Sequence, residues 1–179
     1  MKPSDHFRFC PSCGKPSQDA VGASPFVCGA CGFTFFFNAA TAAAVFLRRE
    51  DGKALFIRRA RDPGKGRLAP PGGFVDIGER AEVGVRREVR EEVGLEMDEP
   101  RFLASFKNSY FYRGVTYPTL DLFFWANAVE PETARSLEDV DGFCWLDPMK
   151  EVTPADMAFE SMGQALEVLR ERWAGERLG

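Results

Sequence analysis

The spacing of apolar and polar positions changes several times along this chain, and each change predicts a new element. Short apolar runs rich in aromatic and β-branched residues predict five strands, at residues 42–47, 54–58, 101–108, 120–128 and 142–146. A turn at Asp51-Gly52 joins the first two of these strands. The stretch 61–71 combines Pro, Gly and basic residues and is typical of a loop.

Two segments instead have the 3.6-residue period of an amphipathic helix. The first is residues 79–93, in which Val85, Val89 and Val93 form a stripe expected to pack on a sheet, and Gly94 is placed to end the helix. The second is residues 157–173, with apolar positions at Phe159, Met162, Leu166 and Leu169. Strands interrupted by one central helix and followed by one terminal helix predict an α/β or α+β sandwich with a mixed sheet.

The N-terminal region has a different character, because it is rich in turns and contains four of the five cysteines. They form two Cys-x-x-Cys pairs separated by fourteen residues, the spacing of a four-thiolate zinc site: Cys10, Cys13, Cys28 and Cys31. Gly14 and Gly32 follow the pairs and suit the tight turns of such a site. Bound iron or reactive thiols are the alternatives. A site with four protein ligands has no open position, so we expect its zinc to be structural.

Composition narrows the possible functions. The chain has 179 residues, of which 45% are hydrophobic, enough for one main domain. We therefore expect a zinc ribbon at residues 1–37 and the main domain at residues 38–179. The net charge of -4 provides no global basic field, so nucleic acid is a disfavoured partner. Neither a signal peptide nor an apolar run of roughly 20 residues is present, which predicts a cytoplasmic protein without a membrane partner.

The main domain contains an unusual cluster of acidic residues on its first helix. Glu88, Glu91 and Glu92 stand at positions i, i+3 and i+4, so they project within an arc of about 100° and are expected to face one point. Like charges so close repel one another, and Mg²⁺ or Mn²⁺, which prefer oxygen ligands, would compensate. A solvated charged helix is the alternative. The Gly72-Gly73 pair favours metal binding, because the Gly73 carbonyl can add a ligand and glycine allows close approach.

These residues belong to a longer pattern. Gly73, Glu79 and the run Arg87-Glu88-Val89-Arg90-Glu91-Glu92-Val93-Gly94-Leu95 resemble the Nudix box at every specified position. The resemblance implies an α/β/α sandwich around a mixed sheet and hydrolysis of a phosphoanhydride bond. It also implies Mg²⁺ or Mn²⁺ held by Glu88, Glu91, Glu92 and the Gly73 carbonyl, with Glu79 as a further ligand or structural partner. Arg87 would orient a catalytic carboxylate, and we favour Glu91 over Glu92 as the base.

A zinc ribbon ahead of a Nudix domain resembles the arrangement of bacterial NADH pyrophosphatases. Those enzymes carry a Ser-Gln-Pro-Trp-Pro-Phe-Pro type motif after the box, whereas this chain has a different sequence at residues 106–117. NADH specificity is therefore not carried over. The expected substrate is a nucleoside diphosphate linked to another moiety, such as ADP-ribose, NAD(H) or a similar dinucleotide. The alternative is a nucleotide-sensing or nucleic-acid-binding protein that uses its ribbon for docking. Homodimers are common among relatives, so a homodimer is possible here.

Residues outside the box are candidates for substrate binding. Tyr110, Tyr112 and Tyr117 can stack on a nucleobase, although packing in a hairpin explains them equally well. Arg58 opens a basic stretch that either contacts phosphates or belongs to a solvated loop. Four acidic residues stand where an additional catalytic carboxylate is possible, and the sequence selects none of them: Glu132, Glu138, Asp139 and Asp141.

Overall fold

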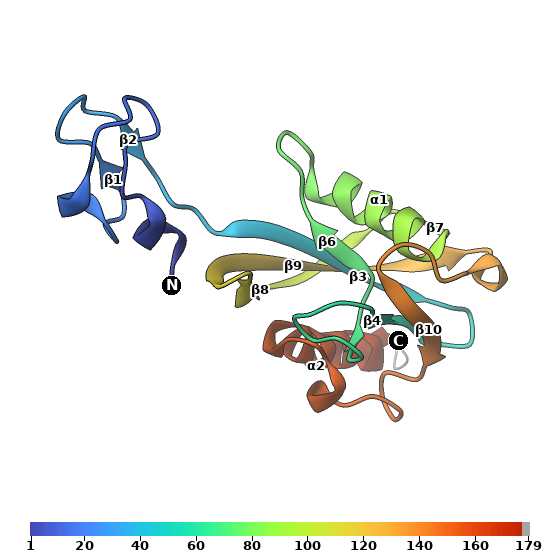
Figure 1. Ribbon diagram of the computed structural model, residues 1–179. Coiled ribbons are helices and arrows are strands. Elements are labelled where there is room, and N and C mark those ends of the chain that lie inside the picture. The colour runs from blue at the N-terminus through green and yellow to red at the C-terminus, as the bar shows by residue number, and fades with distance from the viewer. Residues whose placement is uncertain (177–179) are drawn as a thin grey trace. The chain divides into compact units, whose positions relative to one another are not determined.

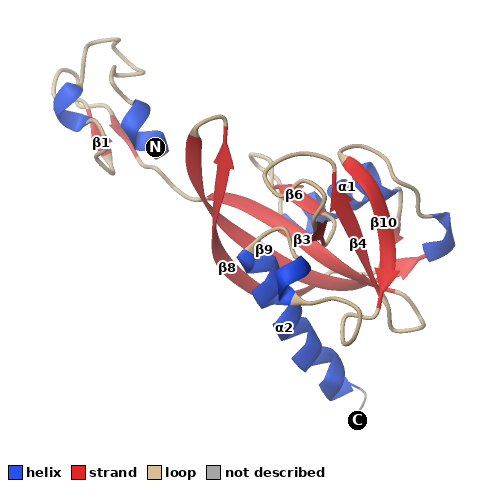
Figure 2. Ribbon diagram, turned by 60° about the horizontal axis from the view of Figure 1, so that its bottom comes forward, coloured by secondary structure: helices blue, strands red, loops and turns tan. Residues whose placement is uncertain are grey.

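The computed structural model describes residues 1–176 and divides the chain into two compact units (Figures 1 and 2). Unit 1 contains Met1–Ala40 together with Ser109–Thr119, and unit 2 contains Thr41–Asn108 together with the residues from Leu120 onward. The predicted division at residues 37 and 38 stays a prediction. The sequence placed the hairpin tip at Ser109–Thr119 in the main domain, whereas the structure groups it with the N-terminal residues. Within unit 1 the Thr116 N–H donates to the Met1 carbonyl at 2.8 Å.

Unit 1 is built from short elements around the cysteines. Its regular parts are two 3-10 turns and a two-stranded sheet: η1 (Pro3–His6), η2 (Gln18–Ala20), β1 (Phe26–Val27) and β2 (Thr34–Phe35). The two strands are antiparallel, with Phe26 opposite Phe35. Phe26, Cys10 and Cys28 are buried and form a small core of their own. A unit with so few apolar residues depends on a further cross-link for stability, as a metal would provide.

Unit 2 contains most of an eight-stranded sheet, of which Ala40 and the tip of the β8–β9 hairpin belong to unit 1. Its strands are β3 (Ala40–Arg48), β4 (Ala54–Arg59), β5 (Leu68–Ala69), β6 (Gly72–Phe74), β7 (Glu96–Met97), β8 (Arg101–Tyr112), β9 (Val115–Val129) and β10 (Val140–Leu146). The order is β10-β4-β3-β9-β7, with β5 beside β4, β6 beside β3 and β8 beside β9. β4 pairs antiparallel with both β10 and β3, whereas β3 and β9 run in the same direction (Figure 1). The sheet is therefore mixed, as predicted.

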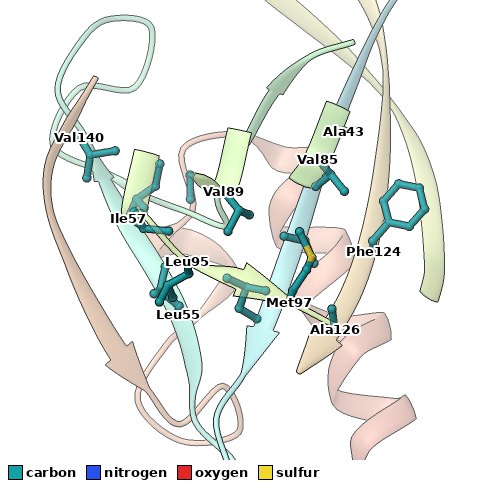
Figure 3. Packing of buried hydrophobic residues seen from close by; sticks show 14 residues of the cluster. Ala43, Leu55, Ile57, Val85, Val89, Leu95, Met97, Phe124, Ala126 and Val140 are labelled. Atoms are coloured by element: carbon teal, nitrogen blue, oxygen red, sulfur yellow. The ribbon is translucent and has the colours of Figure 1, made fainter. Parts of the chain in front are cut away.

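One helix covers each face of this sheet. α1 (Ala81–Val93) packs on one face through Val85 and Val89 (Figure 3) and through Val93, all fully buried. Burying each valine contributes about 1.5–3 kcal/mol. α2 (Glu160–Glu176) packs on the opposite face through Leu166, Leu169 and Trp173. The predicted α/β/α sandwich and the core stripe of the first helix are confirmed.

Several predicted boundaries were wrong, and each has a local cause. α1 begins two residues later than predicted, because the Glu79 carboxylate accepts the Asp76 N–H in the preceding turn. α2 begins at Glu160, since η4 (Pro154–Asp156) comes first and the Ala158 N–H donates to the Leu68 carbonyl at 2.8 Å. β8 and β9 extend to a two-residue turn at Arg113-Gly114, where both residues have positive φ as in a type I′ hairpin.

Candidate active site

The helix α1 places its charged residues at the edge of β6. It ends at Gly94, whose left-handed φ of 66° lets its N–H donate to the Arg90 carbonyl, as the sequence predicted. The valine stripe fixes the rotation of the helix about its axis. Its acidic residues are therefore held in fixed directions relative to the sheet.

The three glutamates of the box differ in exposure. The Glu91 side chain is 47% exposed and that of Glu88 is 17% exposed, whereas Glu92 as a residue is only 9% exposed. Among residues 1–176, only the four cysteines form a group of three or more metal-ligating side chains whose donor atoms all lie within 4.8 Å of one another. That the three carboxylates hold one ion together stays a prediction. The helical arc spreads them from the β6 backbone to the solvent.

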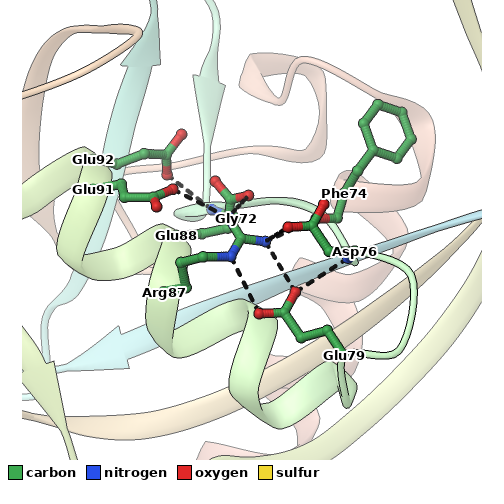
Figure 4. Close-up of polar contacts among 8 residues, drawn as sticks. All are labelled: Gly72, Phe74, Asp76, Glu79, Arg87, Glu88, Glu91 and Glu92. Atoms are coloured by element: carbon green, nitrogen blue, oxygen red, sulfur yellow. Dashed lines mark hydrogen bonds and ion pairs between the residues drawn. The ribbon is translucent and has the colours of Figure 1, made fainter.

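Arg87 connects Glu88 and Glu91 with the earlier Glu79 (Figure 4). Its Nη1 donates to Glu88 Oε1 at 2.8 Å and to Glu91 Oε2 at 3.1 Å. Its Nε and Nη2 donate to the two carboxylate oxygens of Glu79 at 3.2 and 3.0 Å. This pairing lowers the pKa of Glu79 and raises that of Arg87. Arg87 also donates to the Phe74 carbonyl at 3.1 Å, so it ties the helix to the strand as well as to the acidic side chains.

Glu92 is buried against the backbone of the Gly72-Gly73 strand. Its Oε2 accepts the Gly72 N–H at 2.9 Å (Figure 4). The pKa of Glu92 is raised to about 8, chiefly by burial; the hydrogen bond from Gly72 opposes this rise, and the nearby charge of Glu88 adds to it. Ionising a buried carboxylate costs free energy, and a cation bound beside it offsets that cost.

The two glycines allow this close packing. An added Cβ at Gly73 would lie 2.5 Å from Glu88 Oε1. At Gly72, where φ is +152°, an added Cβ would lie 2.2 Å from the Ala43 carbonyl oxygen. The Glu88 carboxylate thus lies against the Gly73 backbone, where any side chain would displace it.

Residues outside the box also act on Glu92, and sequence reasoning did not select them. The charge of Arg59 lowers the pKa of Glu92, and that of Asp139 raises it, both after the dominant effect of burial. The loop that carries Asp139 lies against the C-terminal end of α1. The N–H groups of Leu137 and Glu138 hold it there, because they donate to the carbonyls of Glu92 and Glu91. The Asp139 carboxylate also pairs with Arg61 at 2.6 Å, and a catalytic role for any of the four acidic candidates stays a prediction. The distance between α1 and this loop in the sequence explains why no local pattern could show the effect of Asp139 on Glu92.

The predicted substrate-binding residues belong to different parts of the chain. Arg58 and Arg59 are neighbours in β4, so their side chains point to opposite faces of the sheet. The Nη1 of Arg58 donates to the Gly66 carbonyl at 2.6 Å. Tyr110, Tyr112 and Tyr117 lie on the β8–β9 hairpin tip, within unit 1. The rings of Tyr110 and Tyr112 are 6.3 Å apart, and the Arg113 guanidinium lies 5.3 Å from the ring centre of Tyr112. Their contact with a substrate stays a prediction.

The four cysteines of unit 1 form a second site. Their sulfur atoms all lie within 4.8 Å of one another, with 3.7 Å between Cys10 and Cys31 and 3.8 Å between Cys13 and Cys28. Gly14 and Gly32 have φ of 70° and 74°, which confirms the predicted turns. Hydrogen bonds from the backbone of Ala30 and Cys31 lower the pKa of Cys28 to about 6. This arrangement can hold a metal ion through four thiolates.

In the part of the chain that the structure describes, no helix is both long and apolar enough to cross a membrane.

Comparison with known sequences gives the chain a family. Residues 38–167 match the model of the NUDIX domain. The chain is 32% identical over 139 residues to the NAD-capped RNA hydrolase NudC of Stutzerimonas stutzeri (strain A1501), which covers 77% of this chain and 47% of that protein. It is 35% identical over 101 residues to the mitochondrial NAD(P)H pyrophosphatase NUDT13 of Homo sapiens, covering 56% of this chain and 28% of that protein. The chain thus spans less than half the length of these curated relatives.

Comparison with solved structures agrees on the fold. The crystal structure of a NUDIX hydrolase from Nitrosomonas europaea matches with a TM-score of 0.74, covering 98% of this chain and 94% of that one. Because the identity is 20%, this likeness concerns the fold alone.

Proposed function

The chain belongs to the NUDIX family, and on this premise we propose that it is a metal-dependent hydrolase of nucleoside diphosphate derivatives. The bond cut is the diphosphate linkage between a nucleoside and a second moiety, with ADP-ribose, NAD(H) and similar dinucleotides as the substrate class. Sequence relatives that act on such linkages support this substrate class.

The observation that carries the proposal is the oxygen-rich site at β6. Glu92 is buried on the Gly72 N–H, and Glu88 lies where a Cβ of Gly73 would be. Glu79 and Glu91 join the same network through Arg87. All of these groups are oxygen donors, as Mg²⁺ and Mn²⁺ require. The residues present therefore suit a hard divalent cation.

In this proposal Glu88, Glu91, Glu92, Glu79 and the Gly73 carbonyl are the ligands. A divalent ion bound there would neutralise the charge of the diphosphate and make water a better nucleophile. The protein groups have separate tasks. Arg87 holds Glu88 and Glu91 in orientation through charge-assisted bonds. Glu91, the most exposed of the three box glutamates, takes the proton of the attacking water as general base.

The four-cysteine cluster is proposed to hold zinc as a structural ion. Its four thiolates leave no open position for a substrate or for water, so the ion stabilises unit 1 and takes no part in hydrolysis. A reducing compartment such as the cytoplasm keeps these thiols available as ligands. A homodimer is a further part of the proposal, and light scattering on the purified chain tests it.

A substrate panel tests the function directly. ADP-ribose, NAD(H), NAD-capped RNA and a nucleoside triphosphate are incubated with Mg²⁺ or Mn²⁺, and the products are resolved by chromatography. We expect a nucleoside monophosphate from at least one dinucleotide, and a loss of about two orders of magnitude or more in Glu91→Gln and Glu92→Gln. Glu82→Gln is the matched control, because Glu82 lies on the same helix and pairs with Arg80. Binding without turnover would favour the sensor alternative.

A further inference from the structure

A pocket of about 330 Å³ opens at the end of β4, on the sheet face that α2 covers. The alternation of β4 places Arg58 on the same face as Phe56, which packs with α2. Six residues of unit 2 line the pocket: Arg58, Gly66, Arg67, Leu68, Ala155 and Asp156. None of them belongs to the Nudix box.

Both arginines of the pocket are held in place by backbone carbonyls. Arg67 donates from Nε to the Met157 carbonyl at 2.9 Å and from Nη2 to the Ala155 carbonyl. Arg58 donates from Nη1 to the Gly66 carbonyl at 2.6 Å. Neutral carbonyls orient a guanidinium without cancelling its charge, and a guanidinium carries five N–H donors. The pocket is therefore lined by two oriented cations with donor capacity beyond these bonds.

The acidic residue that lines the pocket, Asp156, makes its side-chain hydrogen bonds to Thr153, although the charge of Arg67 also acts on it and lowers its pKa. Asp156 accepts both the N–H and the hydroxyl of Thr153 on Oδ2, each at 2.7 Å. Two guanidinium groups against one carboxylate leave a local excess of positive charge in a chain whose net charge is -4. Such a pocket selects an anion, and the planar fork of arginine suits a phosphoryl group best.

We propose that this pocket binds a phosphoryl group, with Arg58 and Arg67 as its donors. Leu68 lines the pocket and precedes Gly72 by four residues, which an extended chain spans in at most about 14 Å. The phosphoryl group is either a further phosphate of the substrate, which rests on the proposed function, or part of a separate ligand.

The first experiment uses inorganic phosphate as the probe. The full chain, without added Mg²⁺ or Mn²⁺, is titrated with phosphate while the backbone amide signals of Gly66, Leu68 and Asp156 are followed by NMR. We expect saturable shifts at these amides and a loss of roughly tenfold in affinity in Arg58→Gln. Arg58→Lys keeps the positive charge but lacks the planar guanidinium, so its phosphate affinity is expected to lie between those of the unsubstituted protein and Arg58→Gln. Lys65→Gln is the matched control on the same loop and retains the affinity of the unsubstituted protein.

The second experiment identifies the source of the phosphoryl group. The kcat/KM values are compared for one dinucleotide with and without an additional phosphate on its ribose. A preference for the phosphorylated form that Arg58→Gln removes assigns the pocket to the substrate. If the unsubstituted protein binds phosphate but its substrate preference equals that of Arg58→Gln, the pocket belongs to a separate ligand. Phosphate binding without any hydrolysis would refute the proposed function alone. Absence of shifts at the three amides, or equal affinity in Arg58→Gln, would overturn the pocket assignment.

Discussion

Replacing Gly73 by Ala is expected to impair hydrolysis while leaving the fold intact. The new Cβ would lie 2.5 Å from Glu88 Oε1, whereas ordinary contacts begin at 3.4 Å, so the carboxylate must retreat by about 0.9 Å. A displacement of about 1 Å in a catalytic group can reduce turnover by about 100-fold. Gly73 does not have a positive φ, and its pairing with Ala43 survives the change.

The cost in stability is expected to be small, since the displaced atoms are the end of a flexible side chain. We expect about 1 kcal/mol, or a fall of about 2–4 °C in Tm for a chain of this length. The assay is steady-state hydrolysis of the best substrate beside a thermal melt. Gly29→Ala is the control, because its Cβ meets nothing within 4 Å. If Gly73→Ala turned over within threefold of the unsubstituted protein, the close approach of Glu88 to this backbone would have no catalytic importance.

Three further predictions concern the same two sites. Arg87→Lys keeps the charge but loses the fork that joins Glu79, Glu88 and Glu91, so kcat is expected to fall at least about tenfold with little change in KM, as steady-state kinetics would show. Burial raises the pKa of Glu92 to about 8 from 4.5, so the stability that it contributes is complete below pH 4.5 and is lost as the pH rises toward 8. Melts of the metal-free protein should therefore fall over this range by at most about 1.4 kcal/mol per pH unit, and Glu92→Gln should flatten the dependence. Cys28→Ser is expected to lose the bound zinc measured by elemental analysis, whereas Cys144→Ser, in a residue that is not one of the four clustered cysteines, retains one ion per chain.

The periodic elements of the fold were predictable because they depend on local spacing. Val85, Val89 and Val93 repeat every four residues and are fully buried. The strands β5 and β6 were missed, since each is two or three residues long in a stretch rich in Pro and Gly. The sequence around Gly72 is typical of a loop. In the structure Gly72 is instead paired in the sheet with Ala44 of β3, 28 residues earlier in the chain. Only the assembled sheet reveals this partner.

The chemistry of the site was predictable from the box, but its electrostatics were not. Helix geometry at 100° per residue places Glu92 about 20° from the buried Val85 and Glu91 about 120° from it, so the sequence indicates that Glu92 is the buried one. It gives no information on what Glu92 contacts there, which is the Gly72 N–H, twenty residues earlier in the chain. The influence of Arg59 and Asp139 on Glu92 likewise arises from parts of the chain distant in sequence.

The central claim is that the glutamates of α1 and the Gly73 backbone together hold divalent ions at a diphosphate. Anomalous diffraction from crystals grown with Mn²⁺ and a non-hydrolysable dinucleotide analogue tests it most directly. We predict manganese bonded to carboxylate oxygens of Glu88 and Glu92 and to the Gly73 carbonyl, with the diphosphate of the analogue as a further ligand. Manganese bound elsewhere, with Arg87 still paired to Glu88 and Glu91 and the diphosphate away from α1, would contradict the account.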